Sequence, residues 1–95
     1  MGEPTSDREA VLDLDREEEW VAHTALVREI DRLLDEGSDP AKERSVLLAV
    51  ERGEPIDAKG LRTLREAVDA YLKEAPERDV VTGRSVLETV DAALP

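Results

Sequence analysis

The chain lacks several residue types that carry common protein chemistry. Among its 95 residues there is no cysteine and no phenylalanine, and there is one histidine, one tryptophan and one tyrosine. Without cysteine there is no disulfide and no thiolate metal site, so the hydrophobic core alone has to hold the fold together. We therefore expect no redox chemistry and no bound cofactor.

Long apolar runs are also missing. No stretch approaches the roughly 18 apolar residues of a membrane span, and residues 1–7 have neither the basic nor the apolar region of a secretory leader. We therefore expect a cytoplasmic protein that does not bind membranes. A chain of this length suits one domain that buries only about 60–65 % of its unfolded surface, so a second subunit would stabilise it. On this ground the sequence predicts a homodimer.

What the chain has in excess is negative charge. Asp and Glu number 24 against 13 Lys and Arg, which gives a net charge of −11. This field repels nucleic-acid phosphates and anionic membranes, because both are bound through clustered lysines and arginines. Mutual repulsion of the acids also opposes folding in dilute buffer, whereas about 1 M salt shortens the screening length to about 3 Å. The composition predicts a halophilic, acidic protein that binds no nucleic acid.

Start and stop residues divide the chain into four predicted helices. Asp15 with Glu18 has the spacing of a capping box, and Gly37 ends a helix that begins at residue 16. The second helix has Asp39 as its cap, Pro40 at its first position and Gly53 after its end. Asp57 precedes and Pro76 follows the third helix, and Asp79 or Thr82 caps the fourth. We predict a mainly α fold, a four-helix bundle-like domain over residues 11–95 that follows a flexible N-terminal tail, residues 1–10.

Each predicted helix has one apolar face, which we expect to point to the core. In the first helix this face consists of Trp20, His23, Leu26, Val27, Ile30, Leu33 and Leu34. In the third it consists of Leu61, Leu64, Ala67, Val68, Tyr71 and Leu72. In the fourth it consists of Val86, Leu87, Val90, Ala93 and Leu94. In the second it consists of Val46, Leu47 and Val50, and Leu48 falls outside it. Residues 45–50 could instead form a buried strand, although the flanking Ala, Lys, Glu and Arg favour a helix.

Residues 11–15 alternate between apolar and acidic side chains, which fits a short, half-buried N-terminal strand. Continuing the first helix backwards would place Val11 and Leu14 on its charged face, so the conformation has to change before residue 16. The strand could pair with residues 54–57 or, across a two-fold axis, with a second copy of the chain. The alternatives are an extended lead-in whose Leu12 and Leu14 pack on the bundle, and a short helical turn.

His23 is the residue that invites a metal-binding or catalytic interpretation. Glu19 lies one turn earlier on the same helix, and the two could serve as metal ligands or as an acid and a base. The alternative is an imidazole with one hydrogen bond to a carboxylate or a carbonyl. A zinc site would need carboxylates from other helices, and no Glu-x-x-His repeat occurs. We predict no catalytic, cofactor-binding or metal-binding residue.

Trp20 and Tyr71 are the only aromatic residues, and each lies on the apolar face of its predicted helix. We predict that both belong to the core, with their polar atoms at its boundary. The alternative is that they anchor a protein interface, where both residue types are enriched. The candidate interface residues are Leu12, Leu14, Trp20 and Tyr71.

The chain resembles a family of small, uncharacterised, acidic haloarchaeal proteins. The similarity covers the run from Leu14 through Trp20, His23 and Leu26 to Ile30, followed by residues 61–72 and 76–94. It implies an all-helical cytoplasmic domain of unknown function and carries over no functional residue. A high-GC codon bias is the alternative explanation of the acidic, arginine-rich composition.

No motif in the sequence identifies a function directly. The favoured interpretation is a non-enzymatic protein-protein interaction or regulatory module, because four amphipathic helices account for nearly every apolar residue. One alternative is a small metal-binding or enzymatic bundle centred on His23. Another is an acidic partner or mimic that neutralises a basic protein.

Overall fold

Four helices form the fold. In the computed structural model, which describes residues 9–95, they are α1 (Arg16–Asp35), α2 (Ala41–Arg52), α3 (Ala58–Leu72) and α4 (Glu77–Ala93). Two short strands, β1 (Glu9–Ala10) and β2 (Ile56–Asp57), form an antiparallel pair. The predicted mainly α, bundle-like fold is confirmed, and residues 45–50 are helical. No helix within residues 9–95 is both long and apolar enough to cross a membrane.

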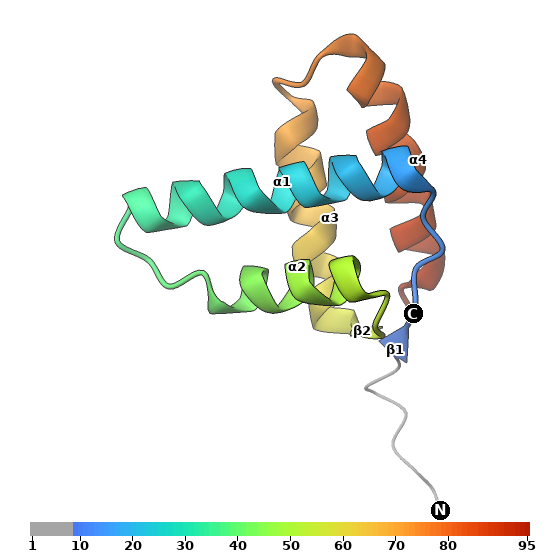
Figure 1. The fold of residues 1–95 in the computed structure, drawn as a ribbon, viewed down its shortest axis with the longest axis horizontal. Helices are drawn as coiled ribbons and strands as arrows, with labels where there is room; N and C mark the ends of the chain where they lie inside the picture. Colours follow the sequence, from blue (N-terminus) through green and yellow to red (C-terminus); the bar gives the residue numbers. More distant parts are fainter. Residues whose placement is uncertain (1–8) are drawn as a thin grey trace, which may run out of the picture.

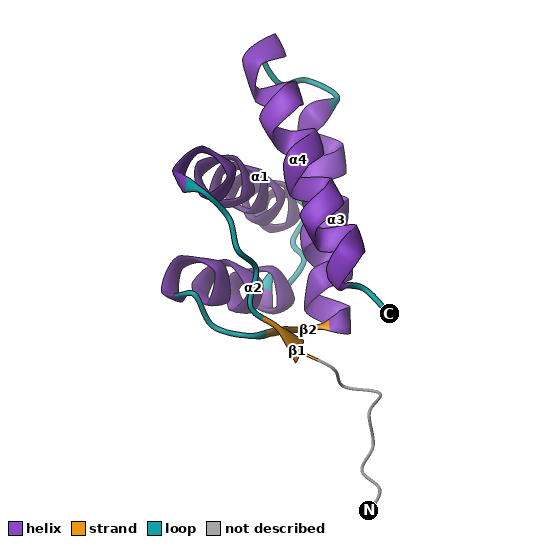
Figure 2. Cartoon of the chain, turned by 90° about the vertical axis from the view of Figure 1, so that its right-hand side faces the viewer, coloured by secondary structure: helices purple, strands orange, loops and turns teal. Residues whose placement is uncertain are grey.

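The helices form two crossed pairs. α1 and α2 lie side by side, α3 passes across both of them, and α4 packs beside α3 and against the first half of α1 (Figure 1). The two strands lie at one end of the molecule, where β2 leads directly into α3 (Figure 2). The core therefore lies where α1 and α3 cross, and its largest fully buried side chains are Leu26, Leu61, Leu64, Val21, Val68, Val86 and Val90.

The predicted capping box at the start of α1 is present and has a further contact. Asp15 accepts a hydrogen bond from the Glu18 amide at 2.8 Å, and Glu18 accepts one from the Asp15 amide at 2.9 Å. The second carboxylate oxygen of Glu18 accepts a hydrogen bond from the Ser85 hydroxyl on α4. A signal that is local in sequence thus also ties the beginning of α1 to α4.

The start of α4 was predicted wrongly. The helix begins at Glu77 with Pro76 as its N-terminal flanking residue, and neither Asp79 nor Thr82 caps it. Proline fixes φ near the helical value, so it can precede a helix without a side-chain cap. Asp79 lies in the first turn, and its carboxylate is used elsewhere, by the hydroxyl of Tyr71.

The buried face of α1 is also rotated from the predicted one. Val21, Ala22 and Ala25 are fully buried, whereas Trp20 and Leu34 are exposed. The prediction weighted large apolar side chains, but α1 packs against α2, α3 and α4, and small residues allow those helices to come close. The prediction that Trp20 belongs to the core is therefore wrong, while Tyr71 is buried as predicted.

The N-terminal strand lies earlier than predicted and pairs within the chain. Glu9 is paired with Asp57 and Ala10 with Ile56, so two residues of the predicted tail belong to a strand. The rest of that tail, residues 1–8, lies outside the described residues. Residues 11–15 are the extended lead-in, and Leu12 and Leu14 are half-buried against the core. The sheet stays this short because α3 begins directly after β2.

Gly60 in the first turn of α3 offers a test of this packing. A Cβ atom there would lie 2.6 Å from Cγ2 of Ile56 and 3.2 Å from Oδ1 of Asp57, the carboxylate that caps α3. Ile56 is buried and β-branched, so it cannot move aside easily. We expect Gly60→Ala to lower the free energy of unfolding by about 1–3 kcal/mol, measured by urea denaturation.

Gly83→Ala is the matched control. Its Cβ would also lie close to a neighbour, 2.4 Å from Cδ2 of Leu72, but that atom is the end of a flexible, half-buried side chain that can rotate. The better helix propensity of alanine offsets part of the cost, by up to about 1 kcal/mol. A larger loss at Gly83 than at Gly60 would contradict this account.

Candidate interaction surface

The four candidate interface residues do not come together on one surface. Leu12 and Leu14 line a small hollow of about 140 Å³ between the lead-in, α2 and β2. Trp20 lines a second hollow between α1 and α4, and Tyr71 lies at the floor of a third between α1 and α3. Of the four, only Trp20 is an exposed side chain, so it is the one that can meet a partner without rearrangement.

Trp20 is exposed because of its position on α1. It lies two residues before the fully buried Ala22 and is therefore about 160° away from it around the helix axis. Its side chain is 55 % exposed. On α4, Val81 lies nine residues before the buried Val90, which is half a turn around that helix, and is 72 % exposed.

Between these two helices lies what we call the Trp20 hollow, with a volume of about 310 Å³. Its lining residues are Glu17, Trp20 and Val21 from α1 and Arg78, Asp79 and Thr82 from α4. Val81, which lies between Arg78 and Thr82 in the sequence, does not line the hollow but is exposed on the same helix. We refer to the Trp20 hollow together with Val81 as the Trp20 face.

A buried hydrogen bond holds one wall of the Trp20 hollow. The Tyr71 hydroxyl donates to Oδ2 of Asp79 at 2.7 Å, and both residues are buried. Burial of the phenol, assisted by the hydrogen bond to Asp79, raises the pKa of Tyr71. The other oxygen, Oδ1, lies 4.0 Å from Nε of Arg78, whose own side chain is almost fully exposed. Asp79 is thus fixed from inside and only weakly paired on the side of the hollow.

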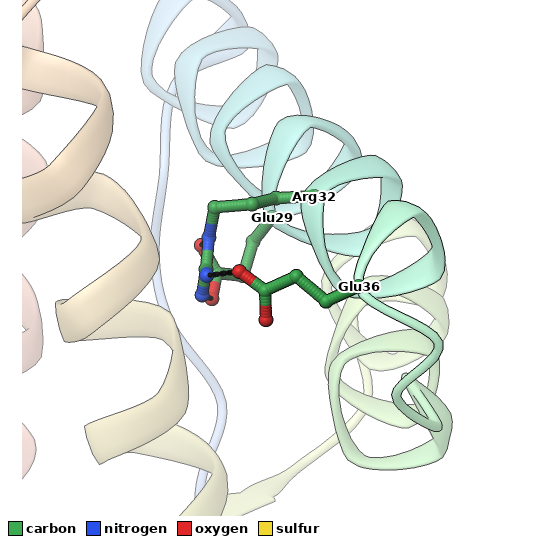
Figure 3. A network of polar contacts seen from close by, with 3 residues as sticks. All are labelled: Glu29, Arg32 and Glu36. Atoms are coloured by element: carbon green, nitrogen blue, oxygen red, sulfur yellow. Dashed lines mark hydrogen bonds and ion pairs between the residues drawn. The ribbon is translucent and has the colours of Figure 1, made fainter.

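The Tyr71 ring also lines the third hollow, where several charged side chains of α1 meet Glu74. The Arg28 guanidinium lies 5.3 Å from the ring centroid and 3.3 Å from Oε2 of Glu74. One helical turn further on, Arg32 is held between Glu29 and Glu36 (Figure 3). The hydrogen bond to Glu29 and the charges of both carboxylates raise the pKa of Arg32. Both arginines of this hollow therefore already have acidic partners.

His23 does not pair with Glu19 as the metal and acid-base hypotheses required. Its Nδ1 lies 2.9 Å from Oε2 of Glu51, so the imidazole connects α1 to α2. Both side chains are more than two-fifths exposed. This contact with a carboxylate agrees with the alternative interpretation, in which the imidazole has a single carboxylate or carbonyl partner. Within residues 9–95, no cluster of three or more His, Asp or Glu side chains is arranged to hold a metal ion.

Sequence reasoning missed the part of the Trp20 face that α4 contributes. Asp79 was taken for a helix cap, and Arg78 and Val81 were not singled out. A usable signal was present, since Val81 lies opposite the predicted apolar face of the fourth helix and has no structural reason to be apolar there.

The chain is a small helical domain with several hollows on its surface. The family described as "Family of unknown function (DUF7853)" matches residues 12–91, which is most of the chain. The chain belongs to this family, and the predicted resemblance to a domain of unknown function is confirmed. No curated protein and no solved structure matches the chain.

Proposed function

We propose that the chain is a non-enzymatic protein-protein interaction module that binds its partner through the Trp20 face. The observation that carries this proposal is the joint exposure of Trp20 and Val81 on two neighbouring helices. An exposed apolar side chain at a hollow that is rimmed by polar residues is typical of an interaction site. Tryptophan is also the residue type most enriched among those that dominate binding energy.

The proposed setting is a salt-rich cytoplasm. Support comes from the net charge of −11 and from the position of the ion pairs: within residues 9–95, four of the six join two exposed side chains. Such pairs contribute little stability, so they cannot offset the repulsion among the remaining acids. The partner is either a second copy of the chain, as the sequence predicts, or an unlike protein.

Site-directed cross-linking tests this proposal. A photoreactive residue in place of Glu77, one turn before Val81, is activated in native extract in molar KCl, and the trapped product is quantified. We expect Trp20→Ala to reduce the yield at limiting protein concentration, because removing a central tryptophan weakens binding by about 30-fold. Light scattering on the purified chain shows whether the product is a dimer.

Leu48→Ala is the matched control, since Leu48 is an exposed apolar residue on α2, away from the Trp20 face. Its cross-linking yield should equal that of the unmodified chain. Equal yields from the unmodified chain and from Trp20→Ala would refute the proposed binding surface, as would an equal loss in Leu48→Ala.

A further inference from the structure

We propose that the Trp20 hollow receives a basic side chain, an arginine or a lysine, from an apolar segment of an unlike protein. This inference rests on the proposed function and names the chemistry of the partner. It follows from three features of the hollow: its aromatic wall, its two carboxylates and the weak hold on its own arginine.

The aromatic wall suits a cation. A guanidinium or ammonium group placed over the face of an indole is attracted by the negative charge of the ring face, and tryptophan is the strongest of the aromatic residues in this respect. The aliphatic part of the same basic side chain can pack against the exposed apolar surface of the Trp20 indole.

The two carboxylates make the hollow complementary to positive charge. Glu17 comes from α1 and Asp79 from α4, so they approach a guest from two helices. Asp79 cannot turn away, because its Oδ2 is held by the Tyr71 hydroxyl at 2.7 Å inside the core. Its Oδ1 remains for a charge-assisted hydrogen bond to a guest. At low salt the net charge of −11 also attracts a basic partner and repels a second copy, whereas in molar salt only the charges inside the hollow act on the guest.

Arg78 is the competitor that the guest has to displace. Its Nε lies 4.0 Å from Oδ1 of Asp79, at the outer limit of an ion pair, and its side chain is 87 % exposed. It can therefore swing into solvent at small cost. This contact also gives the proposal a sharp test, because removing Arg78 should strengthen the binding of a cation and weaken the binding of an anion.

The test uses blocked tripeptides and the fluorescence of Trp20, which is the only tryptophan in the chain and so reports on the hollow itself. The probes are acetyl-Leu-Arg-Leu-amide, its neutral citrulline isostere and acetyl-Leu-Glu-Leu-amide, each titrated in 0.2 M and 2 M KCl. We expect the arginine peptide to bind at least about fivefold more tightly than the citrulline peptide. Glu17→Gln should weaken the arginine peptide about fivefold, and Arg78→Gln should tighten it by a similar factor.

Glu66→Gln is the matched control for charge, because it removes one exposed carboxylate of α3 outside the Trp20 face. It should change the affinity less than twofold. Equal binding of the citrulline and arginine peptides, no binding of either, or preferred binding of the glutamate peptide would each overturn the inference. A Trp20-dependent dimer in light scattering without peptide would also overturn it, since a second copy would then be the occupant. In all these cases a Trp20-dependent cross-link from position 77 would still support the proposed function.

Discussion

Replacing Tyr71 by alanine should lower the free energy of unfolding by about 3–5 kcal/mol, the largest effect that we expect from one substitution. The ring is buried between α1, α3 and α4, with the Arg28 guanidinium on one side and the Asp79 carboxylate at its hydroxyl. Because a domain of this size is stable by roughly 5–14 kcal/mol, the variant should be close to unfolded at moderate urea concentrations. Circular dichroism during urea titration measures the loss.

Tyr71→Phe separates the hydroxyl from the ring. This substitution leaves no cavity, but Asp79 loses its buried hydrogen-bond donor. We expect this loss to lower the free energy of unfolding by about 1–3 kcal/mol. Double-mutant cycles with Asp79→Ala should give a coupling energy of the same size. A coupling energy near zero would show that the hydrogen bond between Tyr71 and Asp79 does not stabilise the fold.

The difference between the unmodified chain and Tyr71→Phe should also depend on pH. Burial and the Asp79 hydrogen bond raise the pKa of Tyr71 in the folded state, whereas the unfolded phenol ionises near pH 10. The unfolded state therefore releases its proton first. The stability that this raised pKa contributes is complete below about pH 10 and is lost as the pH rises through the folded-state pKa. We expect the advantage of the unmodified chain over Tyr71→Phe to shrink only above about pH 10.

Potassium chloride should raise the melting temperature by roughly 10 °C between 0.1 M and 1 M. A net charge of −11 on a body with a radius of gyration of 13.3 Å repels itself more strongly than the same charge on the expanded unfolded chain. With a Debye length of about 10 Å at 0.1 M and 3 Å at 1 M, we estimate that salt removes about 2 kcal/mol of this difference. For a domain of this length that corresponds to a shift of about 8–16 °C.

A variant with a smaller net charge is the control for this prediction, because its melting temperature should depend less on salt. Replacing four exposed acids by amides changes the net charge from −11 to −7 (−11 + 4), and self-repulsion scales with the square of the charge. The chosen residues are exposed and form no ion pair within residues 9–95: Asp31, Asp35, Glu66 and Asp69. The salt response should fall to about two-fifths of its original size. An unchanged response would assign the effect to salting-out of apolar surface instead.

Signals that act within a few residues could be predicted from the sequence. The Asp15 and Glu18 capping box, the glycine at the end of α1 and the Asp57 cap of α3 all depend on backbone groups at most four residues away. The helices and their approximate bounds follow from such signals. The apolar face of α3 was also predicted, because its large residues all point to one side.

Properties that depend on how helices cross could not be predicted in this way. Tyr71 meets Asp79, and His23 meets Glu51, only because of the angles between helix pairs, and neither spacing forms a recognisable motif. The face of α1 that is buried also follows from its three neighbours rather than from its own composition. For this reason the exposure of Trp20, and with it the candidate site, became visible only in the structure.

The pairing of β1 with β2 has a consequence for the order of folding. It joins the ends of a loop made of residues 11–55, and closing a loop of this length costs about 3 kcal/mol or more in chain entropy. Two residue pairs in water, one of which places Glu9 opposite Asp57, cannot offset that cost by themselves. We therefore expect the β1–β2 pair to form only after α1 and α2 have docked on α3, as the last step of folding. The same pair should be the first part of the fold to open.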